Sequence, residues 1–482
     1  MLKLPKMTTQ RLGSRGPAAS VQTDANIPLH FSLPSDTPMS VIVIRTPKFL
    51  WSPPASLGKI LLRLPAPMVV VISAVLLAAT MSPELAARPT ASAGSPESTS
   101  DAAITPSSQL ISSGSRRLPT TTTTAAPLPS TSSSTTVPTD PPGRIVRRGS
   151  ALYLDGKTYA FVGAAVPNGT TLWSVNYGCG TQLSDADLDL LFTSLPPRTV
   201  VSMWATSQLG WNRWTSTIDF TAIDRAVAAA ARHGSFLNLI LATQQGYCGD
   251  GHWKDEAWYA GGYRQAAADD ATKLSYWDWI RQIVPRYATS NTVAMWTLMN
   301  EPDASSCAAG LDGAACYGNL QCSPSAAATL RSFYDTVGQK VKRLDPAHLV
   351  VSGSRGATDC GLQASQYGDL HRSSGIDVCD MHPYGVGDKP LPDSNRDNIL
   401  MCSSAGKVTV IGEMGIDGGD SQTTCPSFAE RSTIFADKFS AYRAQGTSGF
   451  FLWAWAPKVS GCTMAIFPGD PVLAAARANT PT

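Results

Sequence analysis

The sequence of 482 residues has little excess charge: its formal net charge is +2, and charged residues make up only 15% of it. A basic surface for nucleic acid is therefore not expected. The sequence also lacks a Gly-x-Gly-x-x-Gly loop or a P-loop after any strand-like segment, which leaves a nucleotide-binding fold with little support. Hydrophobic residues make up 43% of the chain, enough for a large core, so a soluble enzyme or binding domain is the default class.

Long apolar runs are also missing. The run MVVVISAVLLAAT (68–80) is shorter than the roughly 20 residues that a membrane-spanning helix needs. It follows Lys59 and Arg63 and precedes small residues, a pattern typical of a secretory signal peptide. We expect residues 68–93 to form the signal core and cleavage region, with a short membrane anchor as the alternative. Residues 1–67 show no sustained period, and we expect a disordered extension or a segment that precedes the true start.

Residues 94–143 lack the apolar side chains that folding requires. The stretch PTTTTTAAPLPSTSSSTTVPTDPP consists almost entirely of Ser, Thr and Pro, which predicts an extended linker. The remaining residues, 144–482, are expected to form one large domain. An export signal followed by such a linker predicts a secreted or cell-surface protein.

Cysteine is absent before Cys179, and all ten cysteines follow the linker. An even number of cysteines in an exported domain favours disulfides, although the sequence does not give their connectivity. A zinc site is not indicated, because the sequence has no Cys-x2-Cys pair and no nearby His-x3-His pair.

Short apolar or β-branched runs alternate with helical patterns in the predicted domain. Eight runs are strand candidates: 157–166, 198–205, 236–242, 292–300, 348–354, 376–382, 407–414 and 448–455. Helices are predicted over 185–195, 220–234 and 326–346 from apolar residues spaced three and four apart. Eight strands separated by helices and buried on both faces predict an α/β protein with a (β/α)8 TIM barrel; a doubly wound open sheet is the alternative.

Polar residues cluster where the strand candidates end. Asn300 ends the fourth candidate and Glu301 follows it. His382 ends the sixth candidate and Tyr384 lies two residues beyond it, while Glu413 lies near the end of the seventh. In a parallel barrel these ends open on one face, so the two carboxylates are expected to meet there. Either glutamate alone would as readily be a helix-entry or buried structural acid.

At these positions the chain resembles the TIM-barrel clan of retaining glycoside hydrolases, and within it the cellulase-like family 5, in particular its β-mannanase branch. The matching segments are WTLMNEP, MHPY, VIGEMG and FFLWAW, within a resemblance that runs from about Arg147 to Trp455. Its opening, RRGSALYLDGKTYAFVGAAVPN, also resembles the first hairpin and first strand of mannanase-type members.

The resemblance implies a role for each matching residue. Glu301 would be the general acid/base and Glu413 the nucleophile, which requires Glu301 to keep its proton near neutrality. The implied substrate-binding residues are Asn300 on the sugar 2-hydroxyl, His382 orienting the carboxylates, Tyr384 on the nucleophile and Trp453 under the sugar. Among the aromatic residues near the second and third strands, we take Trp204 as a further substrate contact, with core packing as the alternative for each of them.

Two departures from the family pattern stand out. Many clan members carry Arg at the end of the second strand, and here Ser202 occupies the matching position. Arg355, after the fifth strand, is a candidate substitute, with a surface or salt-bridge arginine as the alternative. The third strand, LNLILATQQGYCG, lacks the histidine common in the cellulase branch, which favours mannan over β-glucan or cellulose.

The sequence and the resemblance together predict a monomeric, secreted β-glycosidase that cleaves a β-linked polysaccharide or oligosaccharide by double displacement. No cofactor, metal, nucleic acid or membrane partner is expected beyond the export signal or anchor. The acids and His252 in GDGHWKDEAWY could form a cation site, but a solvated charged loop is the favoured interpretation. The alternative function is a catalytically impaired carbohydrate-binding or wall-associated barrel, for which Ser202 is the main argument.

Overall fold

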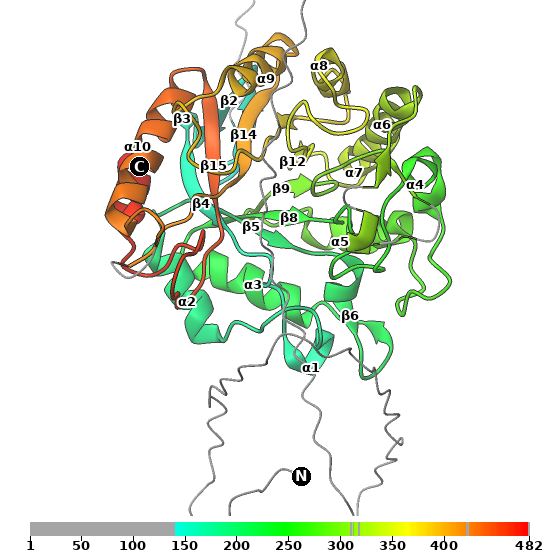
Figure 1. Cartoon of the computed structure of the whole chain (residues 1–482). Coiled ribbons are helices and arrows are strands. Elements are labelled where there is room, and N and C mark those ends of the chain that lie inside the picture. Colours follow the sequence, from blue (N-terminus) through cyan, green and yellow to red (C-terminus); the bar gives the residue numbers. More distant parts are fainter. Residues whose placement is uncertain (1–139, 309–310, 312, 317–318, 421–423, 481–482) are drawn as a thin grey trace, which may run out of the picture. The chain divides into compact units, whose positions relative to one another are not determined.

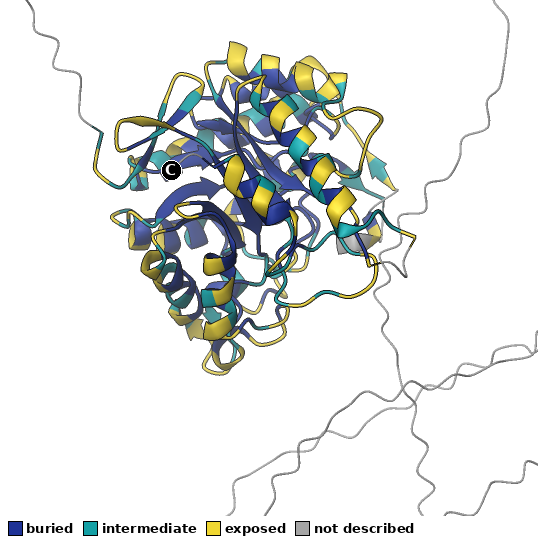
Figure 2. Ribbon diagram, turned by 90° about the vertical axis from the view of Figure 1, so that its left-hand side faces the viewer, coloured by how far each residue is buried: buried dark blue, intermediate teal, exposed yellow. Residues whose placement is uncertain are grey.

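Eight parallel strands close into a barrel in the computed structural model of the chain, which describes residues 140–308, 311, 313–316, 319–420 and 424–480 (Figure 1). The strands are β4 (Phe161–Ala165), β5 (Val200–Trp204), β8 (Phe236–Ile240), β9 (Val293–Thr297), β12 (Leu349–Val351), β13 (Val378–Cys379), β14 (Val408–Met414) and β15 (Thr447–Trp453). Each overlaps one predicted strand, so the predicted (β/α)8 fold is confirmed. Figure 2 shows these strands as a buried inner layer, which explains their nearly continuous apolar sequences.

Helices surround the barrel and expose their outer faces (Figure 2). They are α1 (Trp173–Asn176), α2 (Asp185–Ser194), α3 (Thr221–Arg232), α4 (Glu256–Ala260), α5 (Tyr276–Tyr287), α6 (Ala326–Phe333), α7 (Gln339–Leu344), α8 (Ser365–His371), α9 (Asp393–Ser404), α10 (Phe428–Arg443) and α11 (Val472–Ala478). The three predicted helices are confirmed as α2, α3 and the pair α6–α7. A π-helical turn, Tyr334–Gly338, joins that pair. Helix α3 ends before Gly234, whose φ of 62° suits glycine at a helix end.

A small antiparallel sheet closes the end of the barrel where the strands begin. It consists of β1 (Ile145–Arg148), β2 (Ala151–Leu154) and β3 (Lys157–Tyr159), in that order. Leu152 and Tyr159 pack in one apolar cluster with Phe161, Val200 and other barrel residues. The opposite end, where the strands finish, carries the loops with two short hairpins, β6 (Trp211–Asn212) with β7 (Thr217–Ile218), and β10 (Ser306–Cys307) with β11 (Leu320–Gln321).

All ten cysteines form disulfides, as predicted from their even number. The pairs are Cys179–Cys248, Cys307–Cys316, Cys322–Cys360, Cys379–Cys402 and Cys425–Cys462. Cys179 lies in the loop after β4 and Cys248 in the loop after β8, so the first bridge ties two loops at the open end together. Since every thiol is bonded, none is left to bind zinc.

The predictions for the N-terminal region lie outside the described residues. They concern the extension at 1–67, the signal region at 68–93 and nearly all of the linker at 94–143. Among the residues that are described, no helix is both long and apolar enough to cross a membrane.

Candidate active site

Two carboxylates face each other at the open end of the barrel. Glu301 follows β9 by four residues, and Glu413 is the penultimate residue of β14. One oxygen of Glu301, one oxygen of Glu413 and one nitrogen of His382 all lie within 4.8 Å of one another. The sequence prediction that strand ends bring Glu301, Glu413 and His382 together is therefore realised in the fold.

Glu301 has an unusual backbone conformation. Its φ is 58°, in the left-handed region that side chains other than glycine rarely adopt. The backbone N–H of Glu301 donates to the carbonyl of Gly353 over 2.8 Å, which fixes this turn against the loop after β12. Strained backbone of this kind persists where the surrounding structure enforces it, and it occurs often at functional sites.

His382 links the two carboxylates. Its Nδ1 lies 3.1 Å from Oε1 of Glu301 and 3.6 Å from Oε2 of Glu413, while its Nε2 lies 3.6 Å from Oδ2 of Asp380. Burial disfavours the charged imidazole, but Glu413, Asp380 and Glu301 outweigh this effect and raise the pKa of His382 well above its usual value. At neutral pH the centre therefore holds an imidazolium surrounded by three carboxyl groups.

The two glutamates have opposite pKa shifts. Burial raises the pKa of Glu413 to about 7; the charge of His382 opposes this shift and that of Glu301 adds to it. Burial also favours neutral Glu301, but the hydrogen bond and charge of His382 hold the pKa of Glu301 below its usual value. The sequence analysis predicted a raised pKa for Glu301, whereas in the structure the raised pKa belongs to Glu413. The physical reason is that Glu413 is the more deeply buried of the two, while Glu301 lies nearer to His382 and also feels the charge of Arg355.

The other predicted contacts surround this centre. The Tyr384 hydroxyl donates a hydrogen bond to Oε2 of Glu413, and its ring remains partly exposed. Asn300 is nearly buried beside Glu301, with its backbone N–H bonded to the carbonyl of Ala242 at 2.8 Å. Trp453 ends β15 and is half-buried, whereas Trp455 is buried and donates its indole N–H to Ser194.

Ser202 and Arg355 have different surroundings. Ser202 is buried inside the barrel and accepts a hydrogen bond from Asn238 at 3.1 Å. The Arg355 side chain pairs with Asp359 and lies 3.8 Å from Asp303, and its charge also lowers the pKa of Glu301. Arg355 therefore acts on the Glu301 side, and the cation beside Glu413 is His382.

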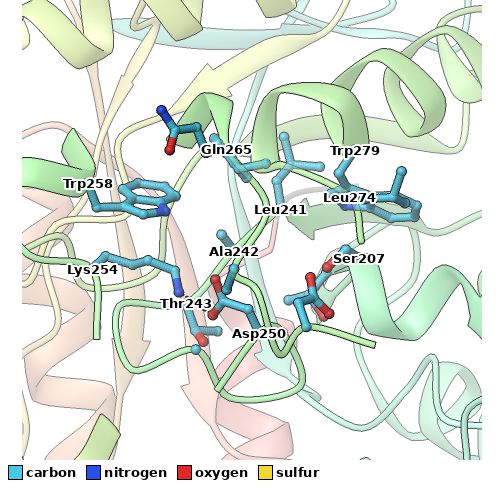
Figure 3. Close-up of a pocket in the computed structure, with 16 residues that line it drawn as sticks. Ser207, Leu241, Ala242, Thr243, Asp250, Lys254, Trp258, Gln265, Leu274 and Trp279 are labelled. Carbon is cyan, nitrogen blue, oxygen red and sulfur yellow. Dashed lines mark hydrogen bonds and ion pairs between the residues drawn. The ribbon is translucent and has the colours of Figure 1, made fainter. Parts of the chain in front are cut away.

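The charged loop GDGHWKDEAWY is held by protein contacts. Figure 3 shows Lys254 directed toward Asp250 beside the ring of Trp258, and Lys254 forms an ion pair with Asp250. Asp255 accepts a hydrogen bond from the backbone at the start of α4, and Glu256 accepts hydrogen bonds from Ser323, Ser325 and Thr329. These acids already have partners in the fold, which supports a structural role over a cation site.

The aromatic residues near the second and third strands divide into two groups. Trp253 is buried and Trp258 packs against the core, as the alternative interpretation predicted. Trp204 is half-buried at the end of β5, while Trp214 and Tyr247 are exposed. Trp204 lines a hollow beside the disulfide Cys179–Cys248.

Sequence reasoning missed two residues of the centre. Asp380 lies two positions before His382, a spacing that puts both side chains on one face of a strand and could have revealed it. Its Oδ1 accepts the backbone N–H of Gly412 at 2.5 Å, and a side chain at position 412 would overlap the Asp380 carboxylate. Gln245, after β8, hydrogen-bonds to Glu301. It lies within LNLILATQQGYCG, the segment noted above only because it lacks a histidine.

Replacing Asp380 with Asn is expected to lower the pKa of His382 by about one to three units, because one of the carboxylates that favour the imidazolium loses its charge. A ring-labelled histidine NMR titration would follow the six histidines, with His382→Gln identifying the signal. Asp369→Asn removes an exposed carboxylate and is the matched control. An unchanged His382 titration in Asp380→Asn would mean that Asp380 does not maintain the charge.

The spacing of Glu301, His382 and Glu413 would also suit metal ligands. The three side chains already contact one another, since Nδ1 of His382 lies 3.1 Å from Oε1 of Glu301 and 3.6 Å from Oε2 of Glu413. Chemically, the centre offers one carboxyl group that can carry a proton and a second, ionised carboxylate. The two are close enough to act on the two atoms of a single substrate bond.

The sequence matches a family model described as cellulase (glycosyl hydrolase family 5) over residues 210–459, just over half of the chain. The matched region includes both glutamates, His382 and Tyr384.

Among similar proteins, the probable mannan endo-1,4-beta-mannosidase C of Aspergillus terreus is 26% identical over 251 residues, which cover 45% of this chain and 56% of the relative. The chain thus spans little more than half of that relative. The probable mannan endo-1,4-beta-mannosidase A of Aspergillus oryzae is 22% identical, over 67% of this chain and 83% of the relative.

Among solved structures, the endo-1,4-beta-mannanase of Rhizomucor miehei superposes with a TM-score of 0.51 at 17% identity, covering 70% of this chain and 98% of that one. At this identity the superposition establishes the barrel fold.

Proposed function

The chain belongs to glycosyl hydrolase family 5, and from that premise we propose that it cleaves β-1,4-linked mannan with retention of anomeric configuration. The observation that carries the proposal is the pair of carboxylate oxygens, one from Glu301 and one from Glu413, within 4.8 Å of each other. Retaining enzymes hold their carboxyl groups about 5–5.5 Å apart, whereas inverting enzymes leave about 6.5–9.5 Å for a water molecule. The short separation supports direct attack by one carboxylate on the sugar.

In the first step, an oxygen of Glu413 attacks the anomeric carbon while Glu301 donates its proton to the departing glycosidic oxygen. A glycosyl ester forms on Glu413, and the remainder of the chain leaves as an alcohol. Glu413 is the better-placed nucleophile because it is more deeply buried and lies on the strand, held by the Tyr384 hydroxyl.

The proton must reside on Glu301 when the substrate is bound. In the free protein His382 favours ionised Glu301, whereas burial and the charge of Glu301 favour the protonated form of Glu413. The Nδ1 of His382 lies 3.1 Å from Glu301 and 3.6 Å from Glu413, so a small movement would change which carboxylate is nearer. We propose that substrate binding draws the imidazolium toward Glu413, which ionises Glu413 and transfers the proton to Glu301.

In the second step, esterification removes the negative charge of Glu413. The pKa of Glu301 then falls, because that charge no longer favours its protonated form. Glu301 accepts a proton from water, the resulting hydroxide displaces Glu413 from the anomeric carbon, and both carboxyl groups return to their starting state.

The remaining predicted residues hold the sugar. Asn300, beside Glu301, would bind the 2-hydroxyl, and half-buried Trp453 at the end of β15 would support the sugar ring. The assignment of mannan follows the printed names of the relatives, and β-glucan is the second candidate. Five disulfides support function outside the reducing cytosol, and we propose a secreted monomer.

Hydrolysis of β-1,4-mannooligosaccharides is expected to release a β-configured reducing end first, because two displacements restore the original configuration. Proton NMR of the anomeric signals during the first minutes, before mutarotation, measures the outcome. A parallel panel of mannan, cellulose and mixed-linkage β-glucan separates the two substrate candidates. An α-configured first product would contradict retention, and glycan binding without any hydrolysis would favour an impaired binding protein.

A further inference from the structure

Exposed aromatic side chains gather on one side of the open end of the barrel. Trp173 is 53% exposed, Tyr177 37%, Trp214 66% and Tyr247 43%. These four lie in or next to the loops after β4, β5 and β8, and Figure 1 shows α1 and β6 side by side. Single exposed apolar residues are ordinary, but an exposed apolar cluster marks an interaction site.

Trp173, Tyr177 and Trp214 form a pre-ordered surface, which we call the aromatic platform. The rings of Tyr177 and Trp214 lie 4.5 Å apart between centroids, at an interplanar angle of 33°. The indole N–H of Trp214 donates a hydrogen bond to the carbonyl of Trp173 at 3.2 Å. The backbone N–H of Arg213 donates one to the carbonyl of Val175 at 2.8 Å. Because the platform is already ordered, a ligand need not bear the cost of immobilising these side chains.

A hollow lies between the sequence neighbours of the platform and the end of a barrel strand. Its volume is about 520 Å³, and its lining includes Gly178 beside the platform, Arg213, Tyr247 and Trp204 at the end of β5. Small-molecule sites typically have volumes of about 300–1,000 Å³. The disulfide Cys179–Cys248 also lines the hollow and joins its two walls.

Polar side chains also line the hollow. Arg213 donates a hydrogen bond to Gln208, and both residues line the hollow together with Asp250. The hollow thus combines aromatic rings with polar side chains that can bind hydroxyl groups.

We propose that the aromatic platform and its hollow bind sugar units of a β-linked glycan away from the bond that is cleaved. A pyranose ring of this kind presents an apolar C–H face and a rim of hydroxyl groups. The electron-rich face of an indole or phenol complements the C–H face, and the side chains of Arg213 and Gln208 in the lining can bind hydroxyl groups. The choice of a glycan rests on the proposed function, since the hollow beside the platform is lined by Trp204 of β5, a strand that finishes at the same open end as the two glutamates.

The platform is tested by binding rather than by turnover. In the full-length chain carrying Glu413→Ala, affinity electrophoresis through soluble galactomannan would measure the dissociation constant. Trp214→Ala in this background is expected to weaken binding about tenfold, while Trp214→Phe, which keeps a stacking ring, retains most of it. Leu400→Ala removes an exposed apolar side chain of α9, 51% exposed, and is the matched control.

Several results would overturn the platform proposal. These are the absence of galactomannan binding, equal binding by Trp214→Ala and its parent, and a concentration-dependent dimer in sedimentation that Trp214→Ala abolishes. The dimer would identify a second copy of the chain as the occupant. Hydrolysis of short mannooligosaccharides by the wild-type protein is measured separately. If binding depends on Trp214 but no hydrolysis occurs, the proposed function is wrong and the platform stands. If hydrolysis occurs but Trp214→Ala binds as its parent does, the platform is wrong and the proposed function stands.

Discussion

Glu413→Ala is expected to lower kcat/KM on β-1,4-mannan by roughly 10⁴-fold or more, the size of loss seen when a principal catalytic group is removed. Without this carboxylate no glycosyl ester forms, and the first displacement has no nucleophile. Initial rates on mannan and on an activated aryl mannoside would both fall. A better leaving group does not help, because the step in which it departs has lost its nucleophile. Activity close to that of the wild type would refute the assignment.

Added azide sharpens this test. Azide is small enough to enter the space vacated by the Glu413 carboxylate and to attack the anomeric carbon of the aryl mannoside once. The expected product is an α-mannosyl azide, inverted relative to the β substrate. Glu430→Ala is the control: that carboxylate is exposed and caps α10 through the backbone N–H of Ser427, so its loss should leave kcat/KM unchanged and yield no azide product.

Glu301→Gln is expected to produce a different pattern. Hydrolysis of mannan should fall by about 10² to 10⁴-fold, the usual contribution of general acid catalysis. An aryl mannoside with a good leaving group does not need the proton and should still form the ester quickly, so the ester accumulates. Stopped-flow release of the aryl group would show this as a burst, and azide would give a β-mannosyl azide of retained configuration.

The pH profile completes this prediction. The active form requires one proton on the Glu301–Glu413 pair, and the pair holds it with a pKa of about 7 at Glu413 in the free protein. The kcat/KM of the wild type is therefore expected to decline as pH rises through about 7, when this proton is lost. With the aryl mannoside, Glu301→Gln should lose that decline. A decline that persists unchanged in the variant would place the titrating group elsewhere.

The sequence predicted the barrel because its strands are short apolar runs buried on both faces, as VVSMW and FLNLI are. It also predicted that Glu301, His382 and Glu413 meet, since parallel strands finish at one end. The pKa values were out of reach, because they depend on whether His382 lies 3.1 or 3.6 Å from a given carboxylate. No sequence pattern carries a difference of this size.

The aromatic residues show a second limit of sequence reasoning. Trp214 and Trp258 look alike in sequence, each in a loop-rich stretch among polar residues. In the structure Trp258 packs against the core, whereas Trp214 stacks on Tyr177 in the open. Their fates depend on which distant segment covers them, and the same dependence left the five cysteine pairings open.

The sheet β1–β3 at the closed end of the barrel fixes where the first described residues lie relative to the two glutamates. The described chain enters through this sheet, and near its other end Thr480 accepts a hydrogen bond from the backbone of Val162, close to the start of β4. Both positions thus lie at the end of the barrel opposite the two glutamates. A support linked to the domain at either position would leave the open end free to meet an insoluble polymer.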